Sequence, residues 1–329
     1  MAQDLLNDTY KLKPTPLKHK NWQLNNYTNF GYIFADYVLV ATAITLSYLL
    51  NNPICYILAI IIIGSRMRAL ENLLHEASHR KLFKNRLLND YGALFLCALP
   101  VVNSLFAYRT AHNKHHRYLN NPKLDPDRMR FEQLNIEKSL ENSLLFVKKM
   151  LRILFFLDTV TFIKGTIKHF IFNKESPLKE IIIRISFYLV VFSFFTYFSV
   201  WPFFLHYWVV PYFSVFQLIR FLAEVSEHGN LYQNADIYQS SRNNLCHPVI
   251  AFILYPHVDH LHLLHHLYPA IPHYASHSVH NDLMEKDQCY QNGMHCHGYF
   301  VQSRKDHNTT FFDLTSSFRA KASGVAHVN

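Results

Sequence analysis

Long apolar runs separated by short polar turns are the first pattern that the chain shows. Residues 31–50 form one such run, which is long enough to cross a hydrocarbon layer of roughly 30 Å and carries Asp36 as its one charged residue. A second helix is predicted to begin at Pro53 and to continue without a break to Arg80, through a stretch of good helix formers. At about 1.5 Å per residue, the last turns of this helix stand roughly 20 Å outside the bilayer.

Two further apolar runs, residues 185–205 and 208–223, follow in the second half of the chain. The turn between them is predicted at residues 206–211. Residues 249–256 are also apolar, but the segment is too short to cross a membrane. The pattern therefore predicts about four membrane-spanning helices.

Two other apolar segments do not have the character of a span. Residues 91–108 are interrupted by Pro100 and Asn103, which favours a re-entrant or interfacial hairpin. Residues 144–163 carry four charged side chains, which favours an amphipathic helix that lies in the plane of the membrane interface.

Charge placement predicts the orientation of these spans. The net charge of the 329 residues is +9, and 20 of the 32 Lys and Arg residues lie between positions 65 and 180. By the positive-inside bias this region faces the cytoplasm, and the turns at residues 51–53 and 206–211 face outward. The basic excess is explained by a cytoplasmic rim against anionic lipid and does not require a nucleic-acid partner. The five cysteines are scattered, which fits free thiols in a reducing compartment.

Nine histidines carry the candidate chemistry, and they fall into three clusters and one outlier. Three or four residues make one helical turn, so each cluster presents its rings from one helix face, and imidazole is the commonest metal ligand. The nine are His75 and His79; His112, His115 and His116; His262, His265 and His266; and His228, which follows Glu227.

The residue types narrow the choice of metal. Cys-x-x-Cys pairs are absent from the sequence, which argues against structural zinc, and oxygen-only cages for calcium or magnesium are not evident. Imidazole-rich coordination suits iron, copper, zinc or nickel. Nine ligands are too many for one ion and about right for two. Iron is our choice, and the spacing alone leaves zinc open.

The clusters can share one site only if the chain returns to the same face of the membrane each time. An even number of crossings between clusters meets this condition. We therefore predict an all-α integral membrane bundle of about four spans with a cytoplasmic, histidine-bearing helical cap. The predicted divisions are a polar N-terminal segment (1–29), the membrane domain (30–285) and a polar C-terminal tail (286–329), flexible from residue 302 onward.

With these histidine boxes, the chain resembles the membrane fatty-acid desaturase family, which includes acyl hydroxylases and carotenoid ketolases. The three boxes match that family's HxxxH, HxxHH and HxxHH pattern in order, over roughly residues 30–285. Short sequence segments next to the boxes are also typical of this family. They are residues 79–86 through Asn89-Asp90, Asp125-Pro126-Asp127, Ile219-Arg220 leading to Glu227-His228, and Leu267-Tyr268-Pro269 followed by Ile271-Pro272.

The resemblance implies a dioxygen-dependent reaction at a centre of two iron ions held by the nine histidines. It also implies that a separate ferredoxin or cytochrome delivers two electrons. The implied substrate is a fatty-acyl lipid or an acyl thioester, and the implied product carries a new double bond. We favour a bacterial inner membrane over the endoplasmic reticulum as the location.

Several further side chains are candidates for supporting roles. Carboxylates that could orient the imidazole rings also fit roles as salt-bridge partners or helix caps. They are Glu76, Asp125, Asp127, Glu224 and Asp259. The text before the third box has one residue more than the family pattern, which makes His257 and His260 candidate extra ligands. The His295-Cys296-His297 stretch is interpreted as incidental.

Two alternatives to desaturation remain open at the level of sequence. Hydroxylation or ketone formation uses the same kind of oxygen chemistry, and the oxygen content of the product distinguishes it from desaturation. A histidine-rich metal sensor or transporter belongs to a different class and predicts metal release or flux without consumption of dioxygen. Transport is disfavoured because its sites lie near the midplane of the membrane, whereas the boxes lie beyond the spans.

Overall fold

The computed structural model describes residues 22–167, 176–231 and 236–315. Within these ranges the chain is mostly helical, which confirms the predicted all-α class, and the named strands form one short parallel pair. The chain forms two compact units. Unit 1 comprises the described parts of Met1–Gln23, Lys114–Lys149 and Phe221–Asn329, and unit 2 comprises those of Leu24–Asn113 and Met150–Arg220.

Unit 2 holds the long helices. Its elements are α2 (Thr28–Leu50), α3 (Pro53–Ser78), α4 (Arg86–Ala93), η1 (Leu94–Ala98), η2 (Leu99–Val101), the first part of α5 (Leu105–Arg117), the end of α8 (Ser143–Leu154), α9 (Thr159–Thr166), α10 (Leu178–Tyr197), α11 (Trp201–Phe204), η4 (Leu205–Val209), η5 (Tyr212–Phe216) and the start of α12 (Gln217–His228).

Unit 1 is built from shorter elements. Besides the remaining parts of α5, α8 and α12 they are α6 (Pro126–Gln133), α7 (Ile136–Ser139), η6 (Ile237–Gln239), β1 (Asn243–Leu245), α13 (Pro248–Leu254), η7 (Pro256–Val258), α14 (His262–Leu267), η8 (His273–Ala275), α15 (Ser276–Lys286), α16 (Gln288–Gln291) and β2 (His295–His297).

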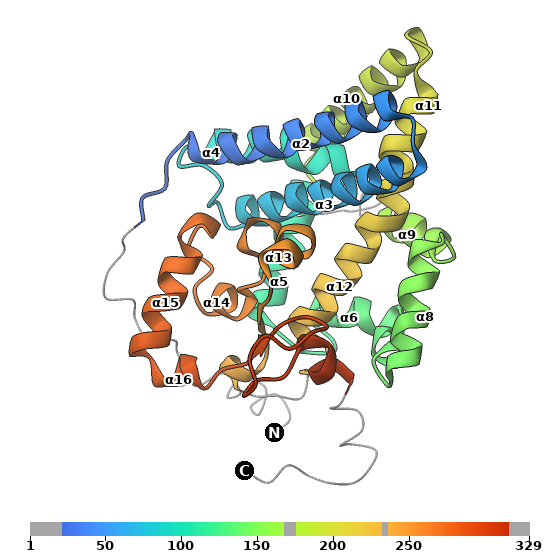
Figure 1. The fold of residues 1–329 in the computed structure, drawn as a ribbon. Coiled ribbons are helices and arrows are strands. Elements are labelled where there is room, and N and C mark those ends of the chain that lie inside the picture. The colour runs from blue at the N-terminus through green and yellow to red at the C-terminus, as the bar shows by residue number, and fades with distance from the viewer. Residues whose placement is uncertain (1–21, 168–175, 232–235, 316–329) are drawn as a thin grey trace. The chain divides into compact units, whose positions relative to one another are not determined.

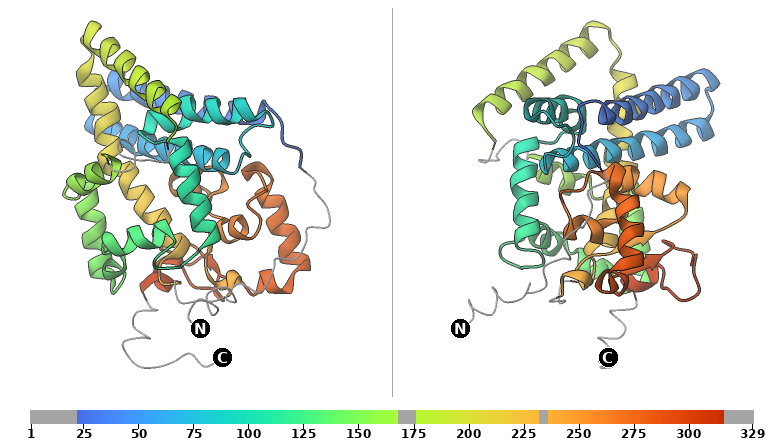
Figure 2. Two further views of the ribbon diagram at one scale, coloured as in Figure 1. Left: turned by 180° about the vertical axis from the view of Figure 1, so that it is seen from behind. Right: turned by 90° about the vertical axis from the view of Figure 1, so that its left-hand side faces the viewer.

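The first two helices form an antiparallel pair, α2 and α3, which lie side by side (Figures 1 and 2). Their connection is built by Asn51, which takes the left-handed conformation at φ 42°, and by Asn52, whose side chain accepts from the Ile54 amide at 2.8 Å. The one charge of the first apolar run is paired, because the Arg66 guanidinium lies 2.9 Å from the Asp36 carboxylate and both are buried. Burial of either charge alone would be costly in an apolar environment.

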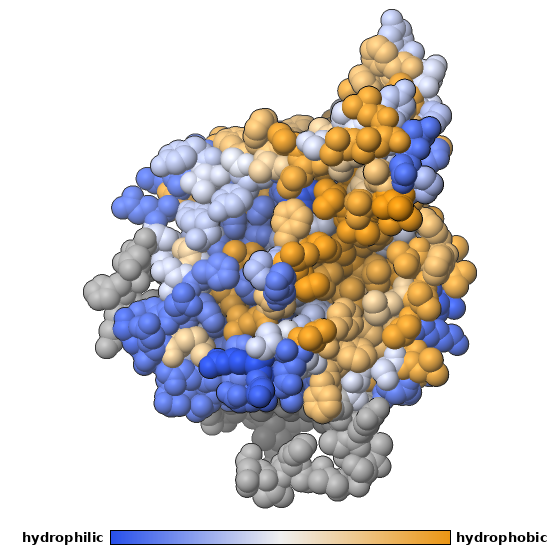
Figure 3. All heavy atoms as spheres, viewed as in Figure 1, coloured by the Kyte–Doolittle hydropathy of each residue, from blue (hydrophilic) through white to orange (hydrophobic). Residues whose placement is uncertain are grey.

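Three of the described helices are long and apolar enough to cross a membrane: Thr28–Leu50, Pro53–Ser78 and Trp201–His228. The count is four if the pair Arg86–Val101 and Leu105–Arg117 forms one span, and these two helices meet at an angle of 92°. The predicted count of about four falls within this range. The predicted span at residues 185–205 is not one of these helices, however, and the predicted span at residues 208–223 lies within Trp201–His228. Figure 3 shows apolar side chains over α10, whereas α15 and α16 present a hydrophilic surface.

The break in the second half of the chain lies earlier than the sequence predicts. α10 ends at Tyr197, Ser199 has φ 53°, and the helix Trp201–His228 continues through residues 206–211, so the predicted turn there is wrong. Pro202 lies in the first turn of this helix, where no N–H donor is needed. Pro211 lies between two π-helical turns, η4 and η5, and such wider turns accommodate the ring and the missing N–H of a proline.

α3 packs closely against η5 at Gly64. A Cβ atom at this position would lie 2.8 Å from the Val215 Cγ1 atom and 2.9 Å from the Phe216 backbone nitrogen. The glycine therefore allows the two helices to approach closely. The cost is a lower helix propensity than that of other residues. Beyond this contact α3 continues to Ser78, which confirms an unbroken helix to within two residues of the predicted end at Arg80.

The segments predicted to be irregular or interfacial are also helical in part. The break at Pro100 and Asn103 is confirmed, because α5 begins only at Leu105. α8 is amphipathic, as predicted, because Phe146 and Ile153 are buried whereas Lys148 and Arg152 on the same helix are exposed. The predicted helix over residues 144–163 is broken, however, since α8 ends at Leu154 and α9 begins at Thr159.

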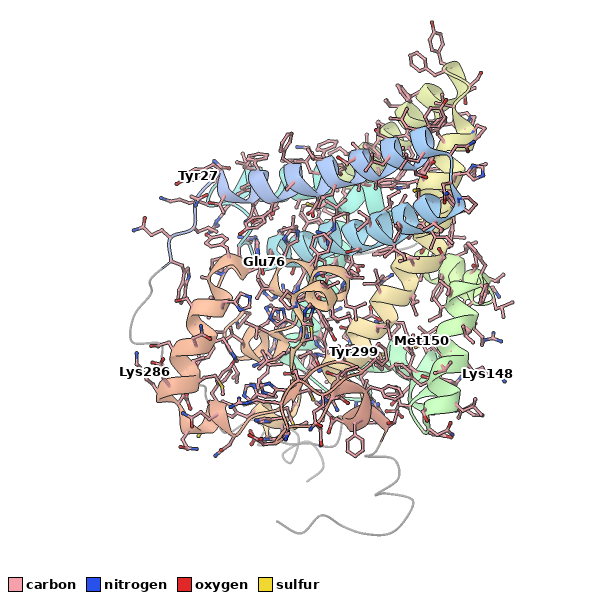
Figure 4. The ribbon with its side chains drawn as sticks, viewed as in Figure 1. Tyr27, Glu76, Lys148, Met150, Lys286 and Tyr299 are labelled. Carbon is pink, nitrogen blue, oxygen red and sulfur yellow. The ribbon has the colours of Figure 1, made fainter. Side chains whose placement is uncertain are left out.

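Parts of the polar C-terminal segment are packed, although residues 300–306 are exposed. β2 pairs in parallel with β1, and the hydroxyl of Tyr299, labelled in Figure 4, donates to the backbone of α12 at 2.9 Å. Arg242 is fully buried and lies 2.5 Å from the carboxylate of Asp313, and Leu314 is fully buried as well. The predicted flexibility is therefore wrong for residues 309–315, because polar partners rather than apolar periodicity hold this segment. Residues 316–329 lie outside the described residues, as do residues 1–21 of the predicted N-terminal segment.

Candidate metal centre

Three of the predicted ligands meet within unit 2. His75 lies in the last turns of α3, His79 follows its end, and His112 comes from α5. The ring centroids of His75 and His112 are 4.3 Å apart, those of His79 and His112 are 4.8 Å apart, and the Nε2 atoms of His79 and His112 are 2.9 Å apart. Tyr108 stacks on His112 one turn earlier, at 5.6 Å between ring centroids.

The end of α3 is fixed by side chains from neighbouring elements. Arg109 donates to the carbonyl oxygens of Ala77 at 2.8 Å and Ser78 at 3.1 Å, and it forms an ion pair with Asp90 at 2.5 Å. Asn89 donates to the Ala77 oxygen as well, at 3.0 Å. These contacts satisfy carbonyl groups that a helix end leaves without partners, and they explain why Asn89-Asp90 follows the first box.

Four further ligands converge within unit 1. They are His115 from α5, His228 from the end of α12, and His262 and His266 from α14, and all four are buried. The distance between Nε2 atoms is 3.0 Å for His228 and His262, and 3.1 Å from His266 to each of these two. His115 lies 3.3 Å from His266 by the same measure. Four nitrogen atoms therefore surround one point.

The opposite ring nitrogen is engaged in two of these four histidines. The Nδ1 atom of His115 lies 2.9 Å from the Asp125 carboxylate, and that of His228 lies 3.1 Å from the Ser240 carbonyl oxygen. Both partners accept hydrogen bonds, so Nδ1 carries the proton and the Nε2 lone pair points to the centre of the cluster. This arrangement is common around ligated metal ions.

Burial keeps His266 in unit 1 and His79 in unit 2 in the neutral form that a metal requires. It lowers the pKa of His266 well below its ordinary value, and the neighbouring imidazoles of His116, His262 and His228 lower it further. In unit 2, burial followed by the charges of Lys81 and Arg109 lowers the pKa of His79 to about 4. Both rings are thus unprotonated at neutral pH.

The remaining two box histidines form a pair within unit 1. The Nε2 atoms of His116 and His265 are 2.9 Å apart, and His116 stacks on His266 at 4.4 Å between ring centroids. On α5, His112 and His116 are four residues apart and so lie on one face of the helix.

The five candidate carboxylates have different surroundings. Asp125 contacts His115 and also caps α6, and burial alone would raise its pKa, but hydrogen bonds from His115 and the Asn120 amide hold the value below its usual range. Asp127 lies 3.5 Å from the same His115 nitrogen. Glu224 forms an ion pair with Arg130 at 2.7 Å.

The other two carboxylates are Glu76 and Asp259. Glu76, labelled in Figure 4, is buried on α3 and belongs to none of the metal-compatible clusters among the described residues. Asp259 is half-buried and lies in such a cluster with Glu227 and His262. In the sequence, Glu227 was noted only because it precedes His228. No local pattern predicted that Glu227, rather than Glu224, would lie beside a candidate ligand.

The candidate extra ligands contact other histidines. The ring of His257 lies 5.2 Å from that of His273, and the ring of His260 lies 5.2 Å from that of His277. Neither belongs to a metal-compatible cluster of the described residues. His295 contacts the Tyr290 carbonyl oxygen at 2.7 Å within the strand pair, which gives it a structural place.

Apolar helices of span length and clusters of histidines define a helical protein with a candidate metal centre. Comparison with known sequences gives the family. Residues 51–300 match the family model described as fatty acid desaturase, and the chain belongs to this family. It is also 28% identical over 259 residues to dihydrorhizobitoxine desaturase of Bradyrhizobium elkanii, a match that covers 75% of this chain and 73% of that protein. These similarities support a desaturase-type or hydroxylase-like oxidoreductase.

Proposed function

We propose that this protein is a membrane desaturase that introduces a double bond into a fatty-acyl chain at a histidine-ligated di-iron centre. The observation that carries the proposal is the convergence of four buried Nε2 atoms, from His115, His228, His262 and His266, at separations of 3.0–3.3 Å. Family membership over residues 51–300 supports the reaction type.

The donor set fits iron. The four rings are buried, the protons of His115 and His228 are held on Nδ1, and the depressed pKa of His266 leaves its lone pair free. Imidazole nitrogen suits first-row ions such as Fe²⁺. When bound, the iron ions supply the redox chemistry that activates dioxygen, and the protein supplies position, electrostatics and exclusion of water.

The proposed ligands of the two ions are the nine box histidines. His115, His228, His262 and His266 would hold one ion, and the other five box histidines are the proposed ligands of the second. Asp125 would keep His115 in the ligating tautomer, and Arg109 would keep the end of α3 in place.

The substrate and the electron donor follow from the family and not from a described contact. We propose an acyl lipid or acyl thioester as substrate and a separate ferredoxin or cytochrome as donor. The relative's name gives dihydrorhizobitoxine as its substrate, so a substrate other than a fatty-acyl chain is the second candidate for this chain. We further propose that the histidines face the cytoplasm, since 20 of the 32 basic residues lie between positions 65 and 180, and that the membrane is a bacterial inner membrane.

Expression in a host with a defined lipid profile tests the proposal. Cells carrying the wild type should gain an unsaturated fatty acid that gas chromatography detects, and cells carrying His265→Ala should not. His206→Ala is the matched control, because His206 is exposed and its ring contacts the Pro202 carbonyl oxygen and the ring of Tyr56 but, among the described residues, none of the box histidines.

The outcomes separate the alternatives. A product with one more oxygen atom by mass spectrometry would replace desaturation with hydroxylation or ketone formation. Equal product from the wild type and His265→Ala would contradict the ligand role of that residue. An unchanged lipid profile in cells whose purified protein is loaded with iron would contradict an acyl substrate.

A further inference from the structure

A carboxylate lies at the edge of the four-histidine cluster. Glu227 precedes His228 on α12, is only 6% exposed, and places its Oε2 atom 3.7 Å from the Nε2 atom of His262. This is the same nitrogen that lies 3.0 Å from His228 and 3.1 Å from His266. The carboxylate therefore lies beside His262, at the edge of the four-histidine cluster, and with Asp259 it forms a second metal-compatible group that shares His262 with that cluster.

The distance matches that between two ligands of one ion. With metal–ligand bonds of about 2.1 Å, two neighbouring ligand atoms are about 3.0 Å apart at an angle of 90° and about 3.6 Å apart at 120°. The imidazole pairs, at 3.0–3.3 Å, fall in the first part of this range. Glu227 and His262, at 3.7 Å, fall at its upper end.

Charge gives a second reason for the carboxylate to bind. Four neutral imidazoles would leave the full charge of a divalent ion in a buried site, where an uncompensated charge is costly. Glu227 is buried as well, so an ion and this side chain would each reduce the cost of burying the other. Oxygen and nitrogen donors together are ordinary ligands of iron.

Other carboxylates in this region are placed differently. Glu224 lies one turn earlier on α12 and is engaged by Arg130 at 2.7 Å. Asp125 and Asp127 contact the outer nitrogen of His115, at 2.9 and 3.5 Å. Asp259 shares the cluster of Glu227 and His262 but is less buried than Glu227.

We infer that Glu227 supplies a fifth, anionic ligand, through one carboxylate oxygen, to the ion at the four-histidine cluster. The inference rests on the proposed metal centre, and it distinguishes this site from one built of histidine alone. The carboxylate gives the bound ion a lower net charge, which favours its higher oxidation state.

Binding of Co²⁺ to the purified, metal-free full-length protein tests the inference without the need for activity. The visible absorption of Co²⁺ is stronger in four-coordinate than in five-coordinate sites. In Glu227→Gln we expect a stronger visible band and a Kd for one of the bound ions that is at least about tenfold higher, since even side chains that only orient a ligand are worth about 10–100-fold in affinity. Glu227→Asp should restore much of the wild-type spectrum.

Glu224→Gln is the matched control, because it removes the same charge from the same helix one turn away and should keep the wild-type spectrum and Kd. A Glu227→Gln protein that matches the wild type in both readouts would overturn the inference and leave the proposed function intact. A wild-type protein that binds no Co²⁺ or Fe²⁺ would overturn the metal centre itself. If Glu227→Gln does not fold, an unchanged spectrum in both Glu227→Asp and Glu227→Ala would overturn the inference equally.

Discussion

Replacement of Asp125 by Asn tests whether the acid beside His115 controls the affinity for metal. In the wild type, one carboxylate oxygen accepts from the Nδ1 atom of His115 at 2.9 Å, and the other accepts from the Asn120 amide at 2.9 Å. An Asn side chain has only one acceptor oxygen. Its amide group can therefore satisfy one of these donors and must oppose the other.

The size of the effect follows from the loss of charge. A hydrogen bond to a charged acceptor contributes about 1.5–3 kcal/mol, whereas a neutral one contributes about 1 kcal/mol. The difference of about 0.5–2 kcal/mol corresponds to a rise of about 2–30-fold in Kd, since each 1.4 kcal/mol is about tenfold. Because His115 is a proposed ligand, a ring that is held less firmly in its ligating orientation would bind the metal more weakly.

Anaerobic competition with an iron chelator measures the Kd directly. Asp127→Asn is the control, because Asp127 lies farther from the same nitrogen, at 3.5 Å, and its side chain is 45% exposed. We expect a change of less than about threefold there, as is usual for exposed pairs. An Asp125→Asn protein with the wild-type Kd, or an equal loss in both variants, would refute the reasoning.

Three further predictions concern stability. Gly64→Ala should lower the thermal unfolding temperature, with a cost of about 1–3 kcal/mol for overpacking against η5, whereas Gly31→Ala, where nothing lies within 4 Å, should not; equal unfolding temperatures would contradict the close contact. The metal-free protein should lose stability as the pH falls from about 6.5 toward 4. Burial and then the charges of His295, His277 and His297 lower the pKa of His280 to about 4. In this pH range the unfolded state therefore binds a proton that the folded state does not bind. His280→Gln should reduce this slope by up to about 1.4 kcal/mol per pH unit, and an identical slope in a pH series of thermal melts would contradict the assignment. Addition of a chelator to the iron-loaded protein should lower its unfolding temperature, and insensitivity in calorimetry would argue against a bound ion.

The helices were largely predictable because their signals are local. An apolar run of span length can be recognised from one segment of the sequence, and so can the helix-forming residues that continue α3 to Ser78. The turn predicted at residues 206–211 is wrong because the π-helical turns on either side of Pro211 keep the helix continuous. The packing of residues 309–315 could not be read either, because it depends on the buried Arg242, which pairs with Asp313, 71 residues away.

By itself, the sequence determined the first two spans, the nine histidines and the one-turn spacing within their boxes, because each is a pattern of neighbouring residues. Only the tertiary structure decided which nitrogen atoms meet: His115 and His266 are 151 residues apart, yet their Nε2 atoms are separated by 3.3 Å. It also decided that Asp125 contacts His115, that Glu224 pairs with Arg130, and that Glu227 lies beside His262. The physical reason is that carboxylates of one type, a turn apart on one helix, differ only in what the fold places opposite them.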